Sequence, residues 1–163
     1  MPSIENKDSA FDSLISAHGS IISKVCYFYA IDTDDFNDLR QEALINLWRG
    51  LDQFRGEAEM STWVYRICLN TCVSYFRSNR KRRLAVRVDE CPQLIADDTD
   101  KGAMLKEMYN LINRLGPTDK ALILMWLDSY DYETIAKVTG IPRNTVASRL
   151  RRIKERLVKY SNL

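Results

Sequence analysis

The chain contains little of what would break, cross-link or anchor a fold. Its 163 residues include four prolines and six glycines, which leaves long stretches free for regular structure. No uncharged apolar run reaches the length of about 18 residues that a membrane helix needs, and the start MPSIENKDSAFDSL lacks the basic-then-apolar order of a signal peptide. We therefore expect no membrane insertion and a cytoplasmic location.

Residues typical of catalytic and metal sites are equally scarce. His18 is the one histidine, and the four cysteines, Cys26, Cys68, Cys72 and Cys91, form no CxxC pair. P-loop, GxSxG and HExxH motifs do not occur. Cys68 and Cys72 lie one turn apart and could ligate a metal with His18, but buried, reduced thiols are the expected state. The sequence predicts no enzyme, no small-molecule substrate, no metal and no cofactor.

The net charge of +2 conceals stretches in which one sign is rare or missing. Residues 1–59 hold 5 basic and 11 acidic side chains, whereas 60–83 hold 6 basic and no acidic ones. Residues 84–103 hold 2 basic and 5 acidic side chains, and 104–163 hold 11 and 6. Because basic stretches attract phosphates and acidic ones repel them, different parts of the chain should face different partners.

Helical spacing of apolar residues predominates, and alternation with period two is rare, so an all-α fold is predicted. A first helix is expected over residues 9–29. A second follows the acidic cluster at 32–35, which suits the positive end of a helix dipole. A third follows the loop around Gly56, begins at N-cap hydroxyls of Ser61 and Thr62, and ends near Arg83.

The periodicity fades over residues 84–103, where Pro92 and several acidic side chains predict a flexible acidic linker. The chain is thus expected to form two small helical domains, 1–83 and 104–163. In the second domain, one helix should run from Met104 to Leu115 and stop at Gly116-Pro117. The next should cover residues 118–128.

The segment YETIAKVTGIPRNTVASRLRRIKERL fits two short helices that cross at a tight turn, a helix-turn-helix. Ala136 is small at the crossing, and Gly140 can adopt the positive φ that the turn needs. The second helix, from about Pro142, exposes a basic face suited to the DNA major groove. The candidate contacts from this pattern are Arg143, Asn144, Ser148, Arg149 and Arg152. The alternative is a helical hairpin whose basic face is merely solvated.

Aromatic and cationic side chains alternate from Phe54 to Arg83, which suits single-stranded DNA because unpaired bases stack on rings. Trp63 could equally belong to the core of an amphipathic helix, and the last cations could serve only the helix dipole. The candidate single-stranded-DNA contacts from this pattern are Phe54, Arg55, Trp63, Arg66, Arg77, Arg80, Lys81, Arg82 and Arg83.

The string DLRQEALINLWRGLDQFRGEAEMSTWVYRICLNTCVSYFRSNRKRR, followed by an acidic linker and a helix-turn-helix, resembles regions 2 and 4 of the sigma-70 family in its extracytoplasmic-function form. The resemblance implies an alternative sigma factor that binds core RNA polymerase, opens the minus-ten element with residues 1–83 and recognises the minus-thirty-five element with residues 104–163. The motifs that match are DxxQE, the loop from Phe54 to Met60, TWxYRIxxN and TVxSR.

Each motif implies a role. Asp38, Gln41 and Glu42 would dock on the clamp helices of the polymerase β′ subunit, and the C-terminal domain would meet the β flap. The loop from Phe54 to Met60, with Arg55 and Gly56, would hold a flipped-out base of the minus-ten element. Trp63, Arg66 and Asn70 of TWxYRIxxN would support melting and minus-ten recognition. With the cations Arg77 and Arg80 to Arg83, these residues are the candidate minus-ten DNA-binding set. Thr145 joins the candidate minus-thirty-five contacts through TVxSR. An anti-sigma factor is a further implied partner, and the linker would pass near the RNA exit path of the polymerase or act as a plain tether.

Ala147 departs from the family pattern, because many relatives have Arg or Lys there. A thymine methyl could be contacted by Ala147 instead. The alternative function is a stand-alone helix-turn-helix transcription regulator, of the luminescence-regulator kind, that binds duplex DNA without polymerase. Such a protein usually has a receiver or ligand-binding domain in front, and residues 1–100 have no βαβ pattern.

Overall fold

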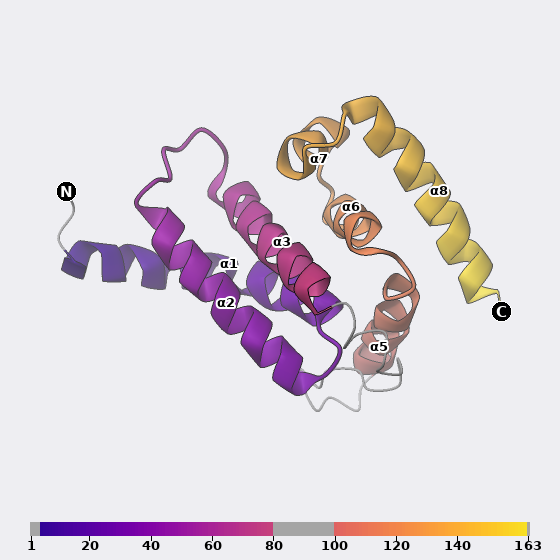
Figure 1. Ribbon diagram of the computed structural model, residues 1–163, viewed down its shortest axis with the longest axis horizontal. Helices are drawn as coiled ribbons and strands as arrows, with labels where there is room; N and C mark the ends of the chain where they lie inside the picture. The colour runs from indigo at the N-terminus through magenta and orange to yellow at the C-terminus, as the bar shows by residue number, and fades with distance from the viewer. Residues whose placement is uncertain (1–3, 80–99, 163) are drawn as a thin grey trace.

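A computed structural model describes residues 4–79 and 100–162, which fold into helices joined by turns and contain no strand (Figure 1). The helices are α1 (Ile4–Tyr29), α2 (Thr33–Leu51), α3 (Met60–Ser78), α5 (Asp100–Ile112), α6 (Pro117–Leu127), α7 (Tyr132–Thr139) and α8 (Arg143–Ser161). The all-α prediction is confirmed. Most of the expected linker, and the cations Arg80, Lys81, Arg82 and Arg83, lie outside the described residues.

Helices α1, α2 and α3 pack together as an N-terminal module (Figure 1). The acidic cluster at the start of α2 supplies side-chain acceptors for two backbone N–H groups. The Asp32 carboxylate accepts a hydrogen bond from the Asp35 backbone N–H at 2.7 Å, and the Asp35 carboxylate accepts one from the Ile31 N–H at 2.9 Å. These bonds satisfy two backbone donors at the helix entrance, which explains why Asp35 is buried.

Several helix boundaries differ from the sequence predictions, and α5 also ends at Ile112 instead of Leu115. α1 begins at Ile4 instead of residue 9, and α5 begins at Asp100, inside the expected linker. The expected caps of α3 are wrong: Ser61 and Thr62 lie in its first turn, and the N-cap is Glu59, whose side chain makes no capping bond. Met60 packs against the core, so burial of apolar side chains, rather than a capping hydroxyl, sets where α3 begins.

Helices α5 to α8 form a C-terminal module that contains the predicted helix-turn-helix in α7 and α8. The Asp131 carboxylate caps α7 by accepting a hydrogen bond from the Thr134 N–H at 2.7 Å, and hydrogen bonding from Thr134 lowers the pKa of Asp131. Gly140 ends α7 with φ of 75°, a left-handed conformation that glycine adopts without steric cost. The turn therefore forms where the sequence predicts it.

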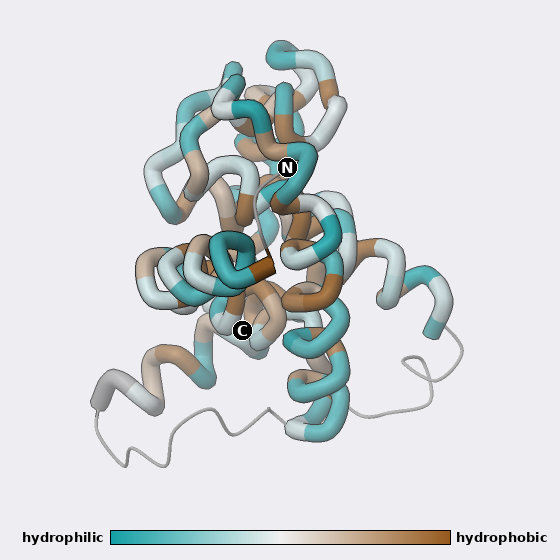
Figure 2. The backbone as a smooth tube through the Cα atoms, turned by 90° about the vertical axis from the view of Figure 1, so that its left-hand side faces the viewer, coloured by the Kyte–Doolittle hydropathy of each residue, from teal (hydrophilic) through white to brown (hydrophobic). Residues whose placement is uncertain are grey.

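The two modules share one hydrophobic core instead of burying two separate ones. The buried residues form a single cluster, in which α6 and α7 pack against α3 (Figure 1). Hydrophobic and hydrophilic segments alternate along the helices, as expected where each helix has one buried face (Figure 2). The tertiary structure thus joins two sets of helices that the sequence separates by a predicted linker.

Hydrogen bonds between the end of α1 and the C-terminal module cross the junction between the modules. The Tyr29 hydroxyl donates to the Pro117 carbonyl at 2.7 Å, and the Tyr109 hydroxyl donates to the Ala30 carbonyl. Lys120, with 0% of its surface exposed, donates to the Phe28 carbonyl at 3.0 Å. Because the last carbonyls of a helix have no partner within the helix, they are suitable acceptors for a neighbouring module.

Asp128, which follows α6, adds a second polar contact between the modules. Its carboxylate accepts a hydrogen bond from the buried Tyr65 hydroxyl at 2.8 Å and pairs with the Lys24 ammonium. Burial, and then the Asp128 charge, raise the pKa of Tyr65 well above its ordinary value. Tyr65 is therefore a neutral donor that holds α3 against the C-terminal module.

Candidate nucleic-acid interface

The outer face of α2 presents the predicted polymerase-docking residues. Asp38, Gln41 and Glu42 are all exposed, and their spacing of three and four places them on one helical face. The opposite face is buried by Leu39, Ala43 and Leu47. This burial fixes how α2 lies on the bundle and directs the two carboxylates toward solvent.

Ile45 extends the same exposed face by one further turn, and sequence reasoning missed it. The residue retains 38% of its surface exposed although it is a large apolar side chain. An apolar residue beside two carboxylates and an amide is typical of a protein-contact surface, where a desolvated centre lies within a polar rim. Ile45 lies seven residues after Asp38 and four after Gln41, so helical spacing places it on the same face and could have identified it from the sequence.

The loop between α2 and α3 holds the residues predicted to meet the minus-ten element. Phe54 is half-buried, and its ring lies 5.2 Å from that of Trp63 at an angle of 50°. Arg55 and Gly56 are exposed, and Gly56 has φ of 73°. Glycine adopts this left-handed conformation without steric cost, and the exposed Arg55 beside it is accessible to a ligand.

Trp63 is half-buried, so part of its ring packs in the core and part stays exposed. A Cβ atom added at Gly50 would lie 3.1 Å from the Trp63 ring, which shows how closely the indole packs on α2. The remaining ring surface stays accessible beside the exposed side chains of Arg66, Asn70 and Arg77. The structure therefore brings Trp63 and these three polar residues to one side of α3, while Tyr65 faces the other module.

A groove between α2 and α3 brings residues of two predicted sites together. It has a volume of about 470 Å³ and is lined by Glu42, one of the predicted polymerase-docking residues, and by Asn70, one of the predicted minus-ten residues. The Asn46 amide donates to the Thr71 hydroxyl at 2.9 Å within it, and this bond ties the two helices together. The sequence separates these residues by a loop, so their meeting depends on tertiary packing.

Helix α8, the second helix of the helix-turn-helix, lies on the surface with its polar face outward. Its buried stripe consists of Val146, Leu150 and Ile153. The predicted DNA contacts Arg143, Asn144, Thr145 and Arg152 are exposed, whereas Ser148 and Arg149 are half-buried. Arg151 is also exposed, although it is absent from the predicted contacts. The basic face thus exists as expected, but its members differ in accessibility.

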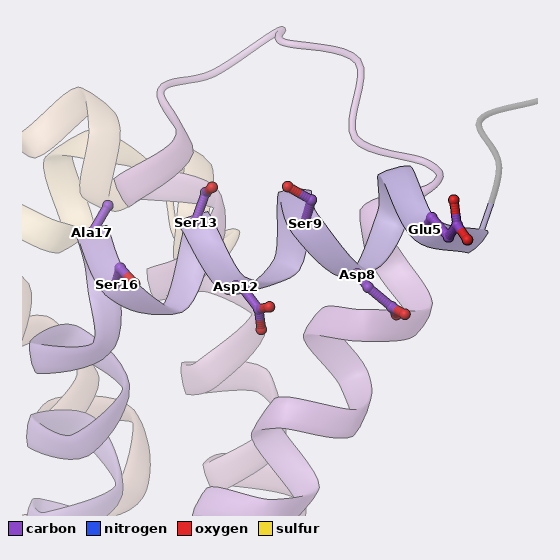
Figure 3. Close-up of a pocket in the computed structure, with 7 residues that line it drawn as sticks. All are labelled: Glu5, Asp8, Ser9, Asp12, Ser13, Ser16 and Ala17. Carbon is purple, nitrogen blue, oxygen red and sulfur yellow. The ribbon is translucent and has the colours of Figure 1, made fainter.

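A shallow hollow along α1 contains several carboxylates. It is lined by Glu5, Asp8, Ser9, Asp12, Ser13, Ser16 and Ala17 (Figure 3). Asp8 and Asp12 point to the other side of the helix from Ser9 and Ser13 in this view, so the acidic and hydroxyl groups do not converge. The hollow is one exposed face of a single helix, without the convergent groups that acid–base chemistry needs.

Cys26, Cys68 and Cys72 are buried in the core. Burial raises the pKa of the Cys68 thiol, so the thiol stays protonated and poorly nucleophilic. Within residues 4–79 and 100–162, no group of three or more His, Cys, Asp or Glu side chains could hold a metal ion. In the same part of the chain, no helix is long and apolar enough to cross a membrane.

Comparisons with known proteins identify two family regions, one in each half of the chain. The protein-family model described as Sigma-70 region 2 matches residues 14–82. The family model described as Sigma-70, region 4 matches residues 105–157. The ECF RNA polymerase sigma-E factor of Escherichia coli K12 is 31% identical over 163 residues, with 90% of this chain and 83% of that protein covered. The sigma-E factor of Haemophilus influenzae is 30% identical, with 90% and 84% covered.

Two solved structures share the fold. The sigma factor RpoE of Bartonella quintana, crystallised with the anti-sigma factor NepR, superposes with a TM-score of 0.73 at 19% identity and covers 98% of this chain and 99% of its own. CnrH, in complex with the cytosolic domain of CnrY, superposes with a TM-score of 0.69 at 21% identity, covering 95% and 89%. At these identities, the superpositions establish a common fold.

Proposed function

Because the chain belongs to the sigma-70 family, as an extracytoplasmic-function sigma factor with regions 2 and 4, we propose that its three exposed surfaces divide the work of transcription initiation. The protein directs core RNA polymerase to promoters. Family members are transcription initiation factors, and we infer that this chain acts by binding, with no catalytic activity of its own.

The outer face of α2 is the proposed polymerase-docking surface. The observation that supports it most is the exposure of Asp38, Gln41 and Glu42 on one face, opposite a stripe that is fully buried. Carboxylates that need not hold the bundle together are free to pair with cations of a partner. The β′ clamp helices are the proposed partner of this face, with Ile45 at its apolar centre.

The loop from Phe54 and the outer face of α3 are the proposed minus-ten surface. Arg66, Asn70 and Arg77 are exposed side chains that can follow a phosphate backbone. The partly accessible Trp63 ring, braced by Phe54, offers a rigid surface on which an unpaired base can stack. Arg80, Lys81, Arg82 and Arg83 continue this basic stretch in the sequence and belong to the same proposal.

The C-terminal module is proposed to bind two partners. Its α8 helix would enter the major groove of the minus-thirty-five element. Met104 and Leu105 on α5 are 65% and 38% exposed, and Val158 near the end of α8 is 61% exposed. A partner would remove this apolar surface from water, so we assign these side chains to the β flap. The domain limits 1–83, 84–103 and 104–163 remain part of this proposal.

An anti-sigma factor is a further proposed partner. The likeness to a sigma factor that was crystallised with NepR supports this proposal. A chain that works with core polymerase would act in the cytoplasm. A stand-alone DNA-binding regulator is not favoured, because the family matches extend over both halves of the chain, the α2 surface included.

Transcription in vitro with purified core polymerase tests the proposal. Each module alone supplies few DNA contacts, so the free chain should bind promoters weakly and with strong salt dependence. Adding core enzyme should produce transcripts that start at defined promoters. Tight, sequence-specific duplex binding by the free chain, with no response to core enzyme, would favour the regulator instead.

A charge reversal tests the docking surface separately. Asp38→Lys/Glu42→Lys should abolish recovery of core subunits in a pull-down and leave the far-ultraviolet circular dichroism unchanged, because both side chains are exposed. Asp8→Lys/Asp12→Lys is the matched control, since it makes the same change in net charge on the exposed face of α1. Equal loss of binding in both variants would show that only net charge matters and would refute the docking assignment.

A further inference from the structure

The first turns of α1 lie against the end of α2, the helix that leads into the loop from Phe54 (Figure 1). The Lys7 ammonium donates to the Asp52 carboxylate, with 2.7 Å between Nζ and Oδ2. The same nitrogen lies 4.3 Å from the centre of the Trp48 ring, and the Phe11 ring meets Trp48 edge to face at 5.2 Å. The start of α1 thus contacts two residues in the last part of α2.

Lys7 is more tightly surrounded than an ordinary surface lysine. Its side chain keeps only 17% of its surface exposed, whereas that of Asp52 keeps 54%. The ammonium is attracted by the Asp52 carboxylate, by the electron-rich face of Trp48 and by the negative end of the α2 dipole. Because the protein itself engages this cation, Lys7 is poorly placed to bind a DNA phosphate.

Asp52 is the residue at which α2 ends and the loop begins. It caps the helix with φ of −65° and ψ of −24°, and its backbone N–H donates to the Gly50 carbonyl. Phe54 continues this turn, since its N–H donates to the Leu51 carbonyl at 3.3 Å. Asp52 and Phe54 therefore belong to one hydrogen-bonded turn, and a displacement of Asp52 would displace Phe54 with it.

The start of the loop is held by two other helices. The Trp63 ring of α3 lies 5.2 Å from the Phe54 ring, and Lys7 of α1 binds Asp52. Residues 55–59 are all exposed, so no buried side chain among them fixes the direction of the loop. That direction therefore depends on where α2 ends.

Lys7 lies outside the part of the chain that the region 2 family model matches, which begins at residue 14. The fold also depends on it little. The packing of α1 rests on buried residues such as Leu14, Ile22 and Val25, and an ion pair with an exposed partner contributes little to stability. The contact with Asp52 thus affects where the end of α2 lies more than whether the chain folds.

We propose that Lys7 is a positioning residue for the flipped-out base that the loop holds, here called the captured base. By binding Asp52, Lys7 fixes the end of α2 so that Phe54 and Arg55 meet the unpaired minus-ten strand in one orientation. The proposal rests on the proposed function of this loop. A loop that is already ordered binds more tightly, because less conformational freedom is lost on binding.

The test measures binding of fluorescent single-stranded oligonucleotides to the full chain in complex with core polymerase. The oligonucleotides carry the minus-ten strand of a promoter that the wild-type complex transcribes, either intact or with one base removed at each position in turn. The base whose removal weakens wild-type binding most is the captured base. Lys7→Ala should weaken binding of the intact strand about fivefold, the low end of the range for one stacked base. Without the captured base, Lys7→Ala and the wild type should bind equally.

Two further variants test whether Lys7 acts through Asp52. Asp52→Ala should cause the same loss as Lys7→Ala, measured as the ratio between the intact strand and the strand without the captured base. The double variant should lose no more, because both substitutions remove one contact. Lys7→Arg should retain most of the affinity, since a guanidinium can pair with Asp52 and stack on Trp48.

Lys106→Ala is the matched control, because it removes the same charge from an exposed position on α5. It should leave oligonucleotide binding unchanged. Far-ultraviolet circular dichroism and the thermal midpoint should stay close to those of the wild type in every variant. A loss of binding without unfolding then reports the position of the loop.

Equal affinity of Lys7→Ala and the wild type for the intact strand would overturn the proposal. An equal loss on the intact strand and on the strand without the captured base would also overturn it, since Lys7 would then bind phosphate or act through net charge. Failure of the proposed function is a separate result: in the wild-type complex, removal of any single base would then leave the affinity unchanged.

Discussion

Lys120 offers the sharpest test of the shared core between the two modules. Its ammonium is fully buried and donates to the Phe28 carbonyl at 3.0 Å and to Asn113 Oδ1 at 2.8 Å. The Tyr29 and Phe76 rings lie 5.0 and 5.6 Å from the same nitrogen. One side chain thus connects the end of α1, the face of α3 and the C-terminal module.

Replacing Lys120 by alanine should lower the free energy of unfolding by about 3 kcal/mol. The three lost methylenes contribute about 2 kcal/mol at about 0.8 kcal/mol each. The two acceptors left without this donor add about 1 kcal/mol each, and the removal of a buried charge offsets part of that cost. Lys120→Met, which keeps the apolar volume, should cost only about 1 kcal/mol.

Urea unfolding followed by tryptophan fluorescence can measure both changes. Because the emission of the three tryptophans overlaps, two variants separate the modules. Trp48→Phe/Trp126→Phe keeps Trp63 in the N-terminal module, and Trp48→Phe/Trp63→Phe keeps Trp126 in the C-terminal module. With Lys120 in place, both variants should unfold at the same urea concentration, because the modules share one core. In Lys120→Ala the transitions should separate. Separate transitions already in the wild type, or an unchanged midpoint in Lys120→Ala, would refute the shared core.

Three further predictions concern local features. Gly140→Ala should cost about 1 kcal/mol because of its positive φ, whereas Gly19→Ala within α1 should be neutral or stabilising; equal urea midpoints would contradict this. Asp131→Ala should lower the thermal midpoint at neutral pH. Since the folded-state pKa of Asp131 is depressed, its stabilisation exists above the ordinary aspartate pKa and should vanish as pH falls through the folded value; a difference that persists in acid would exclude this cause. In a Cys91→Ser background, the thiols, Cys68 included, should resist a thiol reagent until the protein is denatured, and rapid native labelling would show that they are not buried.

Local patterns predicted much of the fold and of the candidate sites. Helical spacing predicted the all-α class, and the small Ala136 with Gly140 predicted the turn of the helix-turn-helix. These features depend on neighbours in the sequence, so they can be recognised without coordinates. The start of α3 was missed because packing of Met60, rather than the hydroxyls of Ser61 and Thr62, decides it.

The sequence by itself determined the helices, the amphipathic faces and the acidic and basic stretches, because these follow from residue type and local spacing. Only the tertiary structure decided that α6 and α7 pack on α3, that Lys120 is buried at the end of α1, and that Asp119 binds Arg149. Such contacts join residues far apart in the chain, and no local pattern specifies which distant partner a side chain will meet. The difference between Arg149 and Arg151 is of this kind: the sequence presents two similar arginines, and the packing of α8 on α6 makes their surroundings different.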